Sequence, residues 1–153
     1  MSPPLMREVK RHLNRATGSE CDDVMIDAPP GVSCPAINAV MDADAIVLVT
    51  EPTPFGLYDL TLAHKAFAQL EIPMGVVVNR SDIGPRDVQA HCRKTGLPIL
   101  AEIPFQRDIA EAYAQGHVIV DALPSTRPLF ESLARRIMAL AGFRTPRGEA
   151  CHA

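Results

Sequence analysis

The chain carries Val-Met-Ile-Asp-Ala-Pro-Pro-Gly at residues 24–31, where a short apolar run leads into an acid and a rigid turn. Such runs are typical of buried strands in parallel sheets, which are apolar on both faces. Asp27 would then stand at the carboxyl end of a strand, where open α/β sheets bind ligands. Pro29 and Pro30 fix the backbone of the turn, and Gly31 lets an amide approach a ligand closely. This combination suits a nucleotide hydrolase, with an acid for hydrated Mg²⁺ and an amide for a terminal phosphate, although an ordinary Asp-Pro turn would show the same residues.

Apolar runs and helical patterns alternate along the rest of the chain at intervals of roughly 25 residues, the spacing of right-handed strand–helix units with a parallel sheet. We therefore predict an α/β fold, with a parallel sheet of four to five strands and flanking helices. Residues 1–143 are expected to form a single domain, and residues 144–153 a mobile tail. The expected strands are 24–27, 45–50, 74–79 and 99–103, with a short edge strand at 117–120. The expected helices are 4–16, 34–42, 57–70, 85–94 and 127–141, and residues 104–106 are expected to lead into a further helix that ends near Gly116.

Composition indicates a globular protein, because 47% of the residues are hydrophobic and 22% are charged. A net charge of −3 gives no reason to expect attraction to nucleic acid or to a membrane surface. The four cysteines are scattered without a C-x-x-C pair, which argues against a zinc site or a disulfide framework and fits a reducing compartment. The sequence shows neither a membrane-spanning run nor a signal-peptide pattern, so we expect a cytoplasmic protein without a transmembrane segment.

Each of the four main expected strands ends in a polar or turn-forming cluster, and the clusters begin at Asp27, Thr50, Asn79 and Ile103. Parallel strands would place all four at one edge of the sheet, which is the expected binding rim. In the cluster Asn79-Arg80-Ser81-Asp82, the amide of Asn79 can pair with a purine edge and the guanidinium of Arg80 can stack on a base or reach phosphate. Adenine and guanine both fit this pattern, and an Asx turn before a helix is the structural alternative.

Cys34 lies just after the Pro-Pro-Gly turn, where a helix N-terminus could stabilise a reactive thiolate. A small buried packing residue is the commoner role for such a cysteine. The five histidines lie on different expected elements without the spacing of metal ligands.

A nucleotide site around Asp27 and Gly31 also needs a cradle for the phosphates. The usual cradle is Gly-x-x-x-x-Gly-Lys-[Ser/Thr], and neither this pattern nor Gly-x-Gly-x-x-Gly occurs in the chain.

The order of the motifs resembles that of MinD/ParA-type P-loop ATPases, and most of all the branch with an inserted ferredoxin domain. The resemblance runs from about residue 5 to 120 and rests on motifs at 24–31 with Cys34-Pro35, 49–56, 78–80, 103–105 and 110–114. It implies a partial P-loop NTPase domain, a Rossmann-like three-layer fold that corresponds to the C-terminal half of those proteins. Their glycine- and lysine-rich Walker A loop and their ferredoxin insert, with its 4Fe–4S cluster, would both lie before Met1.

The resemblance also implies roles for six residues. Asp27 would be the acid near the attacking water and near Mg²⁺, which it would hold through water. Pro30 and Gly31 would lie on the phosphate side of bound ATP, with the amide of Gly31 facing the γ-phosphate. The residues that would frame the adenine are Asn79, Arg80 and Pro104.

The expected function is therefore that of the C-terminal half of an ATP-binding switch ATPase, coupled to iron–sulfur chemistry and acting as a homodimer or with a P-loop-bearing chain. Without its own P-loop, the chain is not expected to hydrolyse ATP alone. One alternative is a stand-alone binding or regulatory module that pairs with a P-loop-bearing partner, and another is a different α/β enzyme that uses Cys34. In the implied fold, the P-loop strand lies between strands 24–27 and 45–50. Without it, these two strands would either pair directly or expose edges that associate.

Overall fold

The computed structural model describes residues 23–142, and the strands in this range form one parallel sheet in the order β1-β2-β3. These strands are β1 (Ile46–Thr50), β2 (Met74–Asn79) and β3 (Ile99–Ile103). The register of β1 on β2 runs from Ile46 opposite Met74 to Thr50 opposite Val78. Both strands are rich in β-branched residues, which pack well on a pleated, buried surface.

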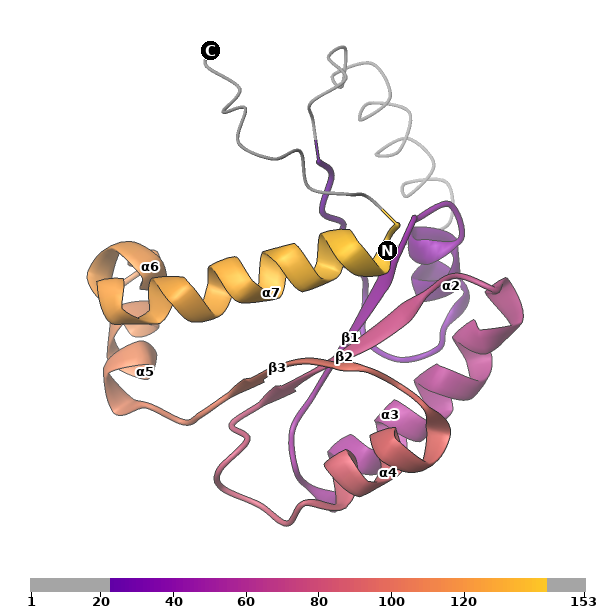
Figure 1. Cartoon of the computed structure of the whole chain (residues 1–153), viewed down its shortest axis with the longest axis horizontal. Coiled ribbons are helices and arrows are strands. Elements are labelled where there is room, and N and C mark those ends of the chain that lie inside the picture. Colours follow the sequence, from indigo (N-terminus) through magenta and orange to yellow (C-terminus); the bar gives the residue numbers. More distant parts are fainter. Residues whose placement is uncertain (1–22, 143–153) are drawn as a thin grey trace.

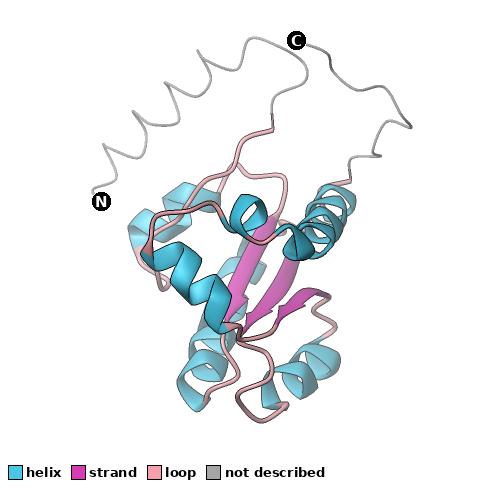
Figure 2. Cartoon of the chain, turned by 90° about the vertical axis from the view of Figure 1, so that its left-hand side faces the viewer, coloured by secondary structure: helices cyan, strands magenta, loops and turns pink. Residues whose placement is uncertain are grey.

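Helical segments connect and follow the strands, so that the sheet forms the middle of three layers (Figures 1 and 2). Side chains on the two opposite faces of the strands contact the helices of the two outer layers, as expected for a sheet that is buried on both sides. The helices are α2 (Cys34–Val40), α3 (Pro54–Phe67), α4 (Asp87–Thr95), α5 (Arg107–Ala114), α6 (Ile119–Ala122) and α7 (Arg127–Leu140), and the short 3₁₀ helices are η1 (Ala68–Leu70) and η2 (Pro124–Thr126).

Local sequence signals explain where the crossover helices begin and end. The hydroxyl of Thr53 accepts a 3.0 Å hydrogen bond from the amide of Gly56, which caps α3 at its N-terminus. Pro54 follows as the first helical residue, where its missing N–H is of no consequence. Gly96 ends α4 with a φ of 73°, a left-handed conformation that glycine adopts without strain.

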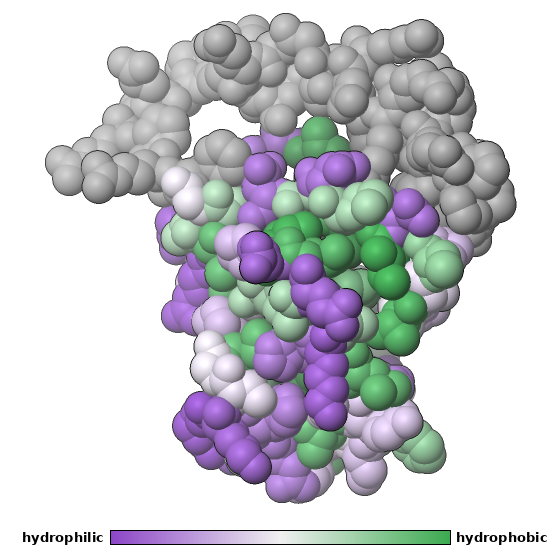
Figure 3. Space-filling view, turned by 90° about the vertical axis from the view of Figure 1, so that its right-hand side faces the viewer, coloured by the Kyte–Doolittle hydropathy of each residue, from purple (hydrophilic) through white to green (hydrophobic). Residues whose placement is uncertain are grey.

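Two apolar clusters hold the layers together. Ile46 and Leu48 of β1 and Val76 of β2 pack with α2, α3 and α4 on one face of the sheet. On the other face, Val77 and Leu100 pack against one side of α7, which presents Leu129, Leu133, Ile137 and Leu140. Figure 3 shows that hydrophobic side chains also reach the surface in the upper half of one side of the molecule, whereas hydrophilic side chains dominate its lower half.

The structure confirms the α/β class, the parallel sheet and the flanking helices, with element bounds close to those predicted. Two expected strands are wrong, and the sheet accordingly has three strands among residues 23–142. Residues 24–27 form no strand and pair with no strand among residues 23–142, because a hollow lies between them and β1. Residues 117–120 instead lead into α6, where the amides of Asp121 and Ala122 bond back to the carbonyl of Val118. The expected helix at 4–16 and the expected tail at 144–153 lie outside the described residues.

Candidate functional site

The parallel arrangement brings the carboxyl ends of β1, β2 and β3 to one edge of the sheet. The loops that follow β2 and β3 are tied to each other there. The amide of Ser81 donates a 2.9 Å hydrogen bond to the carbonyl of Ile103, and the amide of Phe105 donates a 2.6 Å hydrogen bond to Oδ1 of Asp82. These bonds fix Asn79, the last residue of β2, close to Pro104, the first residue after β3.

Arg80 joins the loops of all three strands. Its φ of 51° is unusual for a residue other than glycine and turns the chain sharply after β2. Its Nε lies 3.6 Å from Oε1 of Glu51, in the loop after β1. Its guanidinium carbon lies 5.7 Å from the centre of the Phe105 ring, in the loop after β3. The guanidinium plane is thus held at the rim between a carboxylate and an aromatic ring, where it remains half exposed and available to a ligand.

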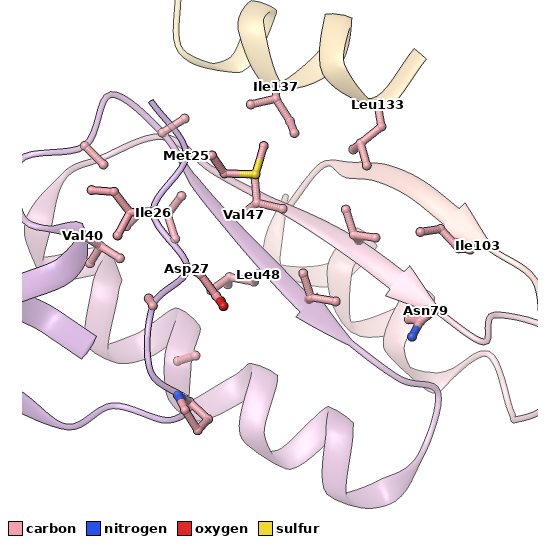
Figure 4. A pocket seen from close by; sticks show the side chains of 18 of the residues that line it. Met25, Ile26, Asp27, Val40, Val47, Leu48, Asn79, Ile103, Leu133 and Ile137 are labelled. Atoms are coloured by element: carbon pink, nitrogen blue, oxygen red, sulfur yellow. The ribbon is translucent and has the colours of Figure 1, made fainter. Parts of the chain in front are cut away.

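The unpaired segment at 24–31 forms the opposite wall of the site and runs in the same direction as β1 (Figure 4). The side chain of Asp27 is exposed and points from this segment toward β1. Gly31 has a φ of 80°, and a Cβ placed on it would meet no atom within 4 Å. Its backbone is therefore open to close approach by a ligand, and the left-handed conformation favours glycine.

A large hollow of about 2310 Å³ lies between this segment and the sheet. All six residues singled out from the sequence line it, namely Asp27, Pro30, Gly31, Asn79, Arg80 and Pro104. Ligand pockets usually have volumes of about 300–1,000 Å³, so a nucleotide alone would leave much of this hollow unfilled. The rest of the lining is largely apolar and comes from both faces of β1, from α3 and from α7.

The polar groups that line the hollow could bind only part of Mg²⁺–ATP. An exposed carboxylate at Asp27 can hold a hydrated Mg²⁺ through water, and the rim from Asn79 to Phe105 offers an amide, a guanidinium and a ring for a base. The described residues contain no glycine-rich loop or lysine in the hollow that could surround the phosphates. Residues 23–142 therefore include groups that could contact the base and groups that could contact the metal ion. They do not include a cradle for the phosphates.

Cys34 and the three histidines of residues 23–142, which are His64, His91 and His117, do not line this hollow. Cys34 is exposed at the start of α2 and is not among the residues that line the hollow. His64 of α3 and His91 of α4 contact each other edge to face, with ring centres 6.4 Å apart. Burial, and secondarily the nearby His91, lower the pKa of His64. Residues 23–142 contain no group of three or more His, Cys, Asp or Glu side chains that could hold a metal ion, and none of their helices is long and apolar enough to cross a membrane.

Sequence reasoning missed several residues of the site. Glu51 and Phe105 directly follow Thr50 and Pro104 in the clusters at the strand ends. This position next to the expected rim was the only feature of the sequence that pointed to them. The apolar wall formed by Leu133 and Ile137 of α7 carries no such signal, because a core-facing helix and a helix that lines a hollow show the same pattern.

The sequence model of the ParA family, described as the NUBPL iron-transfer P-loop NTPase, matches residues 2–138. The chain belongs to this family. Among curated members with similar sequences, an uncharacterized protein of Methanocaldococcus jannaschii is 29% identical over 112 residues, which cover 73% of this chain and 37% of that protein. An iron–sulfur cluster carrier protein of Aquifex aeolicus is 28% identical over 139 residues, which cover 81% of this chain and 38% of the carrier. The chain thus spans less than half the length of both relatives.

Solved structures show the same fold. The cell division ATPase MinD of Pyrococcus furiosus superposes with a TM-score of 0.69 and 26% identity, over 91% of this chain and 59% of that chain. The cell division protein MinD of Aquifex aeolicus superposes with a TM-score of 0.70 and 18% identity, over 97% of this chain and 64% of that chain. The ParA-family member described here therefore has a MinD-like α/β fold and covers only part of its structural neighbours.

Proposed function

We propose that this chain forms the C-terminal half of an ATP-binding switch ATPase that serves iron–sulfur cluster transfer. The observation that carries the proposal is the hollow at the carboxyl edge of the sheet, which joins an acid, an open glycine backbone and a base-binding rim. Ligands of open α/β sheets bind at this edge. The membership in an iron-transfer P-loop NTPase family and the carrier named among the relatives support the link to iron–sulfur clusters.

Each side of the hollow has a separate task in this proposal. Asn79 pairs with the adenine edge, while Arg80 and Pro104 flank the base. The backbone amide of Gly31 faces the γ-phosphate, with Pro30 fixing the turn before it. Asp27 holds Mg²⁺ through a water molecule and orients the attacking water. The metal ion, when bound, neutralises charge on the phosphates.

The proposal assigns nucleotide binding and hydrolysis to an assembly in which a P-loop is added to this chain. Residues 23–142 lack a phosphate cradle, and its electrostatic stabilisation supplies most of the catalysis in phosphoryl transfer. The assembly would be a homodimer of complete proteins or a complex with a P-loop-bearing chain, located in the cytoplasm. The 4Fe–4S cluster would be held by a part outside residues 23–142.

The test is ATP turnover by this chain joined to a P-loop-bearing segment, with and without Asp27→Asn. The neutral amide cannot orient water and metal as a carboxylate does, so we expect turnover to fall by about a hundredfold or more while nucleotide still binds. Asp87→Asn is the matched control, because Asp87 lies in the first turn of α4, away from the hollow. Turnover that is unchanged by Asp27→Asn would contradict the assignment of Asp27.

A further inference from the structure

Asp82 is the acidic residue of the cluster at 79–82, and the function proposed above leaves it without a role. In a site that reads guanine, such a carboxylate would accept hydrogen bonds from the N–H groups of the base. Here Oδ1 of Asp82 instead accepts a 2.6 Å hydrogen bond from the backbone amide of Phe105. Phe105 lines the hollow, and Asp82 does not. The carboxylate therefore contacts a residue of the wall and not the space that a base would occupy.

The bond to Asp82 fixes the chain on one side of Pro104. Proline has no N–H of its own, so the amide of Phe105 is the first backbone donor after β3. On the other side of Pro104, the carbonyl of Ile103 accepts a 2.9 Å hydrogen bond from the amide of Ser81. The two bonds together set the position of Phe105 relative to the end of β2.

The ring of Phe105 in turn contacts Arg80. The guanidinium carbon lies 5.7 Å from the ring centre, within the range of a cation–π contact. Glu51 holds the same guanidinium from the loop after β1, with its Oε1 3.6 Å from Nε. Phe105 nevertheless remains 46% exposed and the side chain of Arg80 51% exposed. The ring and the guanidinium thus form a surface with a free side, and a planar base can stack on such a surface.

The contacts of Arg80 exist before any ligand arrives. A free arginine side chain has many rotamers, and ordering it on binding lowers affinity. Arg80 is already held by a carboxylate and by a ring, so a ligand that stacks on it orders less of the chain. The placement of the ring, and hence of the bond to Asp82, should therefore affect nucleotide affinity.

We propose that Asp82 is a positioning residue, which holds Phe105 in place so that its ring and the guanidinium of Arg80 form a preformed platform for a nucleobase. Asp82 itself does not contact the base and takes no part in the choice between adenine and guanine. The link from Asp82 through Phe105 to Arg80 is a property of the chain alone. Only the ligand of the platform rests on the function proposed above.

The first part of the test measures this link in the chain without nucleotide. Hydrogen–deuterium exchange, read by mass spectrometry at single residues, reports the amide of Phe105 at concentrations low enough to keep the chain monomeric. Asp82→Ala removes the acceptor, so this amide should exchange about tenfold faster or more. Asp82→Asn keeps one carbonyl oxygen as an acceptor and should retain the protection. Equal exchange at Phe105 in the parent chain and in Asp82→Ala would overturn the proposal.

The second part measures the affinity for ATP and for GTP in this chain joined to a P-loop-bearing segment. Asp82→Ala should weaken the binding of both nucleotides by the same factor, about three- to tenfold, because either purine stacks on the platform. Asp82→Asn should bind both within about twofold of the parent, since the acceptor is kept. A loss confined to GTP, or one that Asp82→Asn does not repair, would overturn the proposal, because a carboxylate that reads the base gives this pattern. Asp87→Ala, at an exposed acid outside the hollow, is the matched control.

A double variant shows whether Asp82 acts through the ring. Phe105→Leu keeps an apolar side chain but removes the ring that holds Arg80, so it should also weaken both nucleotides by about three- to tenfold. When Asp82→Ala is added to Phe105→Leu, the further loss should be less than about twofold, because the two residues act as one unit. Losses that multiply would overturn the proposal, since they would show that the two residues act independently. Thermal unfolding checks that each variant is folded.

The two parts also separate this proposal from the proposed function. If the joined chain binds neither nucleotide while the Phe105 amide depends on Asp82, the link stands and the proposed nucleotide site fails. If the joined chain binds ATP with an affinity that does not depend on Asp82 or Phe105, the nucleotide site stands and the platform is excluded.

Discussion

At the scale of single residues, the rim proposed to bind the base depends on the geometry of the loop after β2. Asn79 ends β2 half-buried, and the left-handed turn at Arg80 carries the chain away immediately after it. The side chain of Asn79 is therefore held by a strand, which is a more rigid support than a loop. The rigid placement favours a role in recognition, where a side chain must keep its position before the ligand arrives.

We predict that Asn79→Ala, made in this chain joined to a P-loop-bearing segment, lowers ATP affinity by about three- to tenfold, the value of one neutral hydrogen bond. Phosphate-dependent Mg²⁺ binding should stay unchanged, because the substitution removes only a contact to the base. Titration with a fluorescent ATP analogue measures the affinity. Asn38→Ala on α2, outside the hollow, serves as the control. An equal affinity of Asn79→Ala and the parent chain would exclude Asn79 from the site.

The positions of the rim residues and of Asp27 could be predicted from the sequence. The ends of the strands in a parallel sheet share one edge, and the sequence has polar residues at these ends. All six predicted residues line the hollow, although their roles in binding stay predictions. The apolar half of the lining was not predictable. Leu133 and Ile137 could either pack against a neighbouring element or border open space. The outcome depends on which elements lie beside β1, and the sequence around these two residues does not indicate it.

At the scale of elements, β2 and β3 begin and end at the predicted residues. Proline precedes each strand, and a turn residue or a second proline follows it. The failures at 24–27 and 117–120 have a common cause. A strand requires a neighbour, and the apolar pattern states only that a segment can be buried. Residues 24–27 have the pattern but no strand partner among the described residues.

The contact between α3 and α4 leads to a prediction on pH. The lowered pKa of His64 means that the folded chain binds fewer protons there than the unfolded chain just below pH 6.5. Stability should therefore decrease as the pH falls below about 6.5, and His64→Gln should reduce this decrease. Urea unfolding at about pH 7.5 and 5.5 measures it. His117→Gln, at an exposed site, should leave the decrease unchanged; an identical pH dependence of His64→Gln and the parent would refute the prediction.

At the scale of the whole molecule, the edge of β1 that has no strand partner among residues 23–142 predicts self-association of the chain when it is produced alone. Exposed strand edges with apolar neighbours pair readily with other copies. Light scattering should show oligomers or aggregates at micromolar concentrations, and Val49→Lys should reduce them because an inward-pointing charge protects an edge. Val118→Lys adds the same charge elsewhere as a control. A monodisperse monomer with a sharp cooperative thermal transition would count against this prediction.

The hollow has a further consequence for the heat capacity of the chain. Unfolding raises the heat capacity because it hydrates apolar surface, by about 12–15 cal/mol/K per residue in ordinary domains. Here apolar side chains that border the hollow, such as Val49 at 68% and Met25 at 91%, are already exposed in the folded state. Their exposure changes little on unfolding, so calorimetry should give a smaller increment per residue. A smaller increment flattens the curve of stability against temperature. The chain alone should therefore show a broad, shallow stability curve.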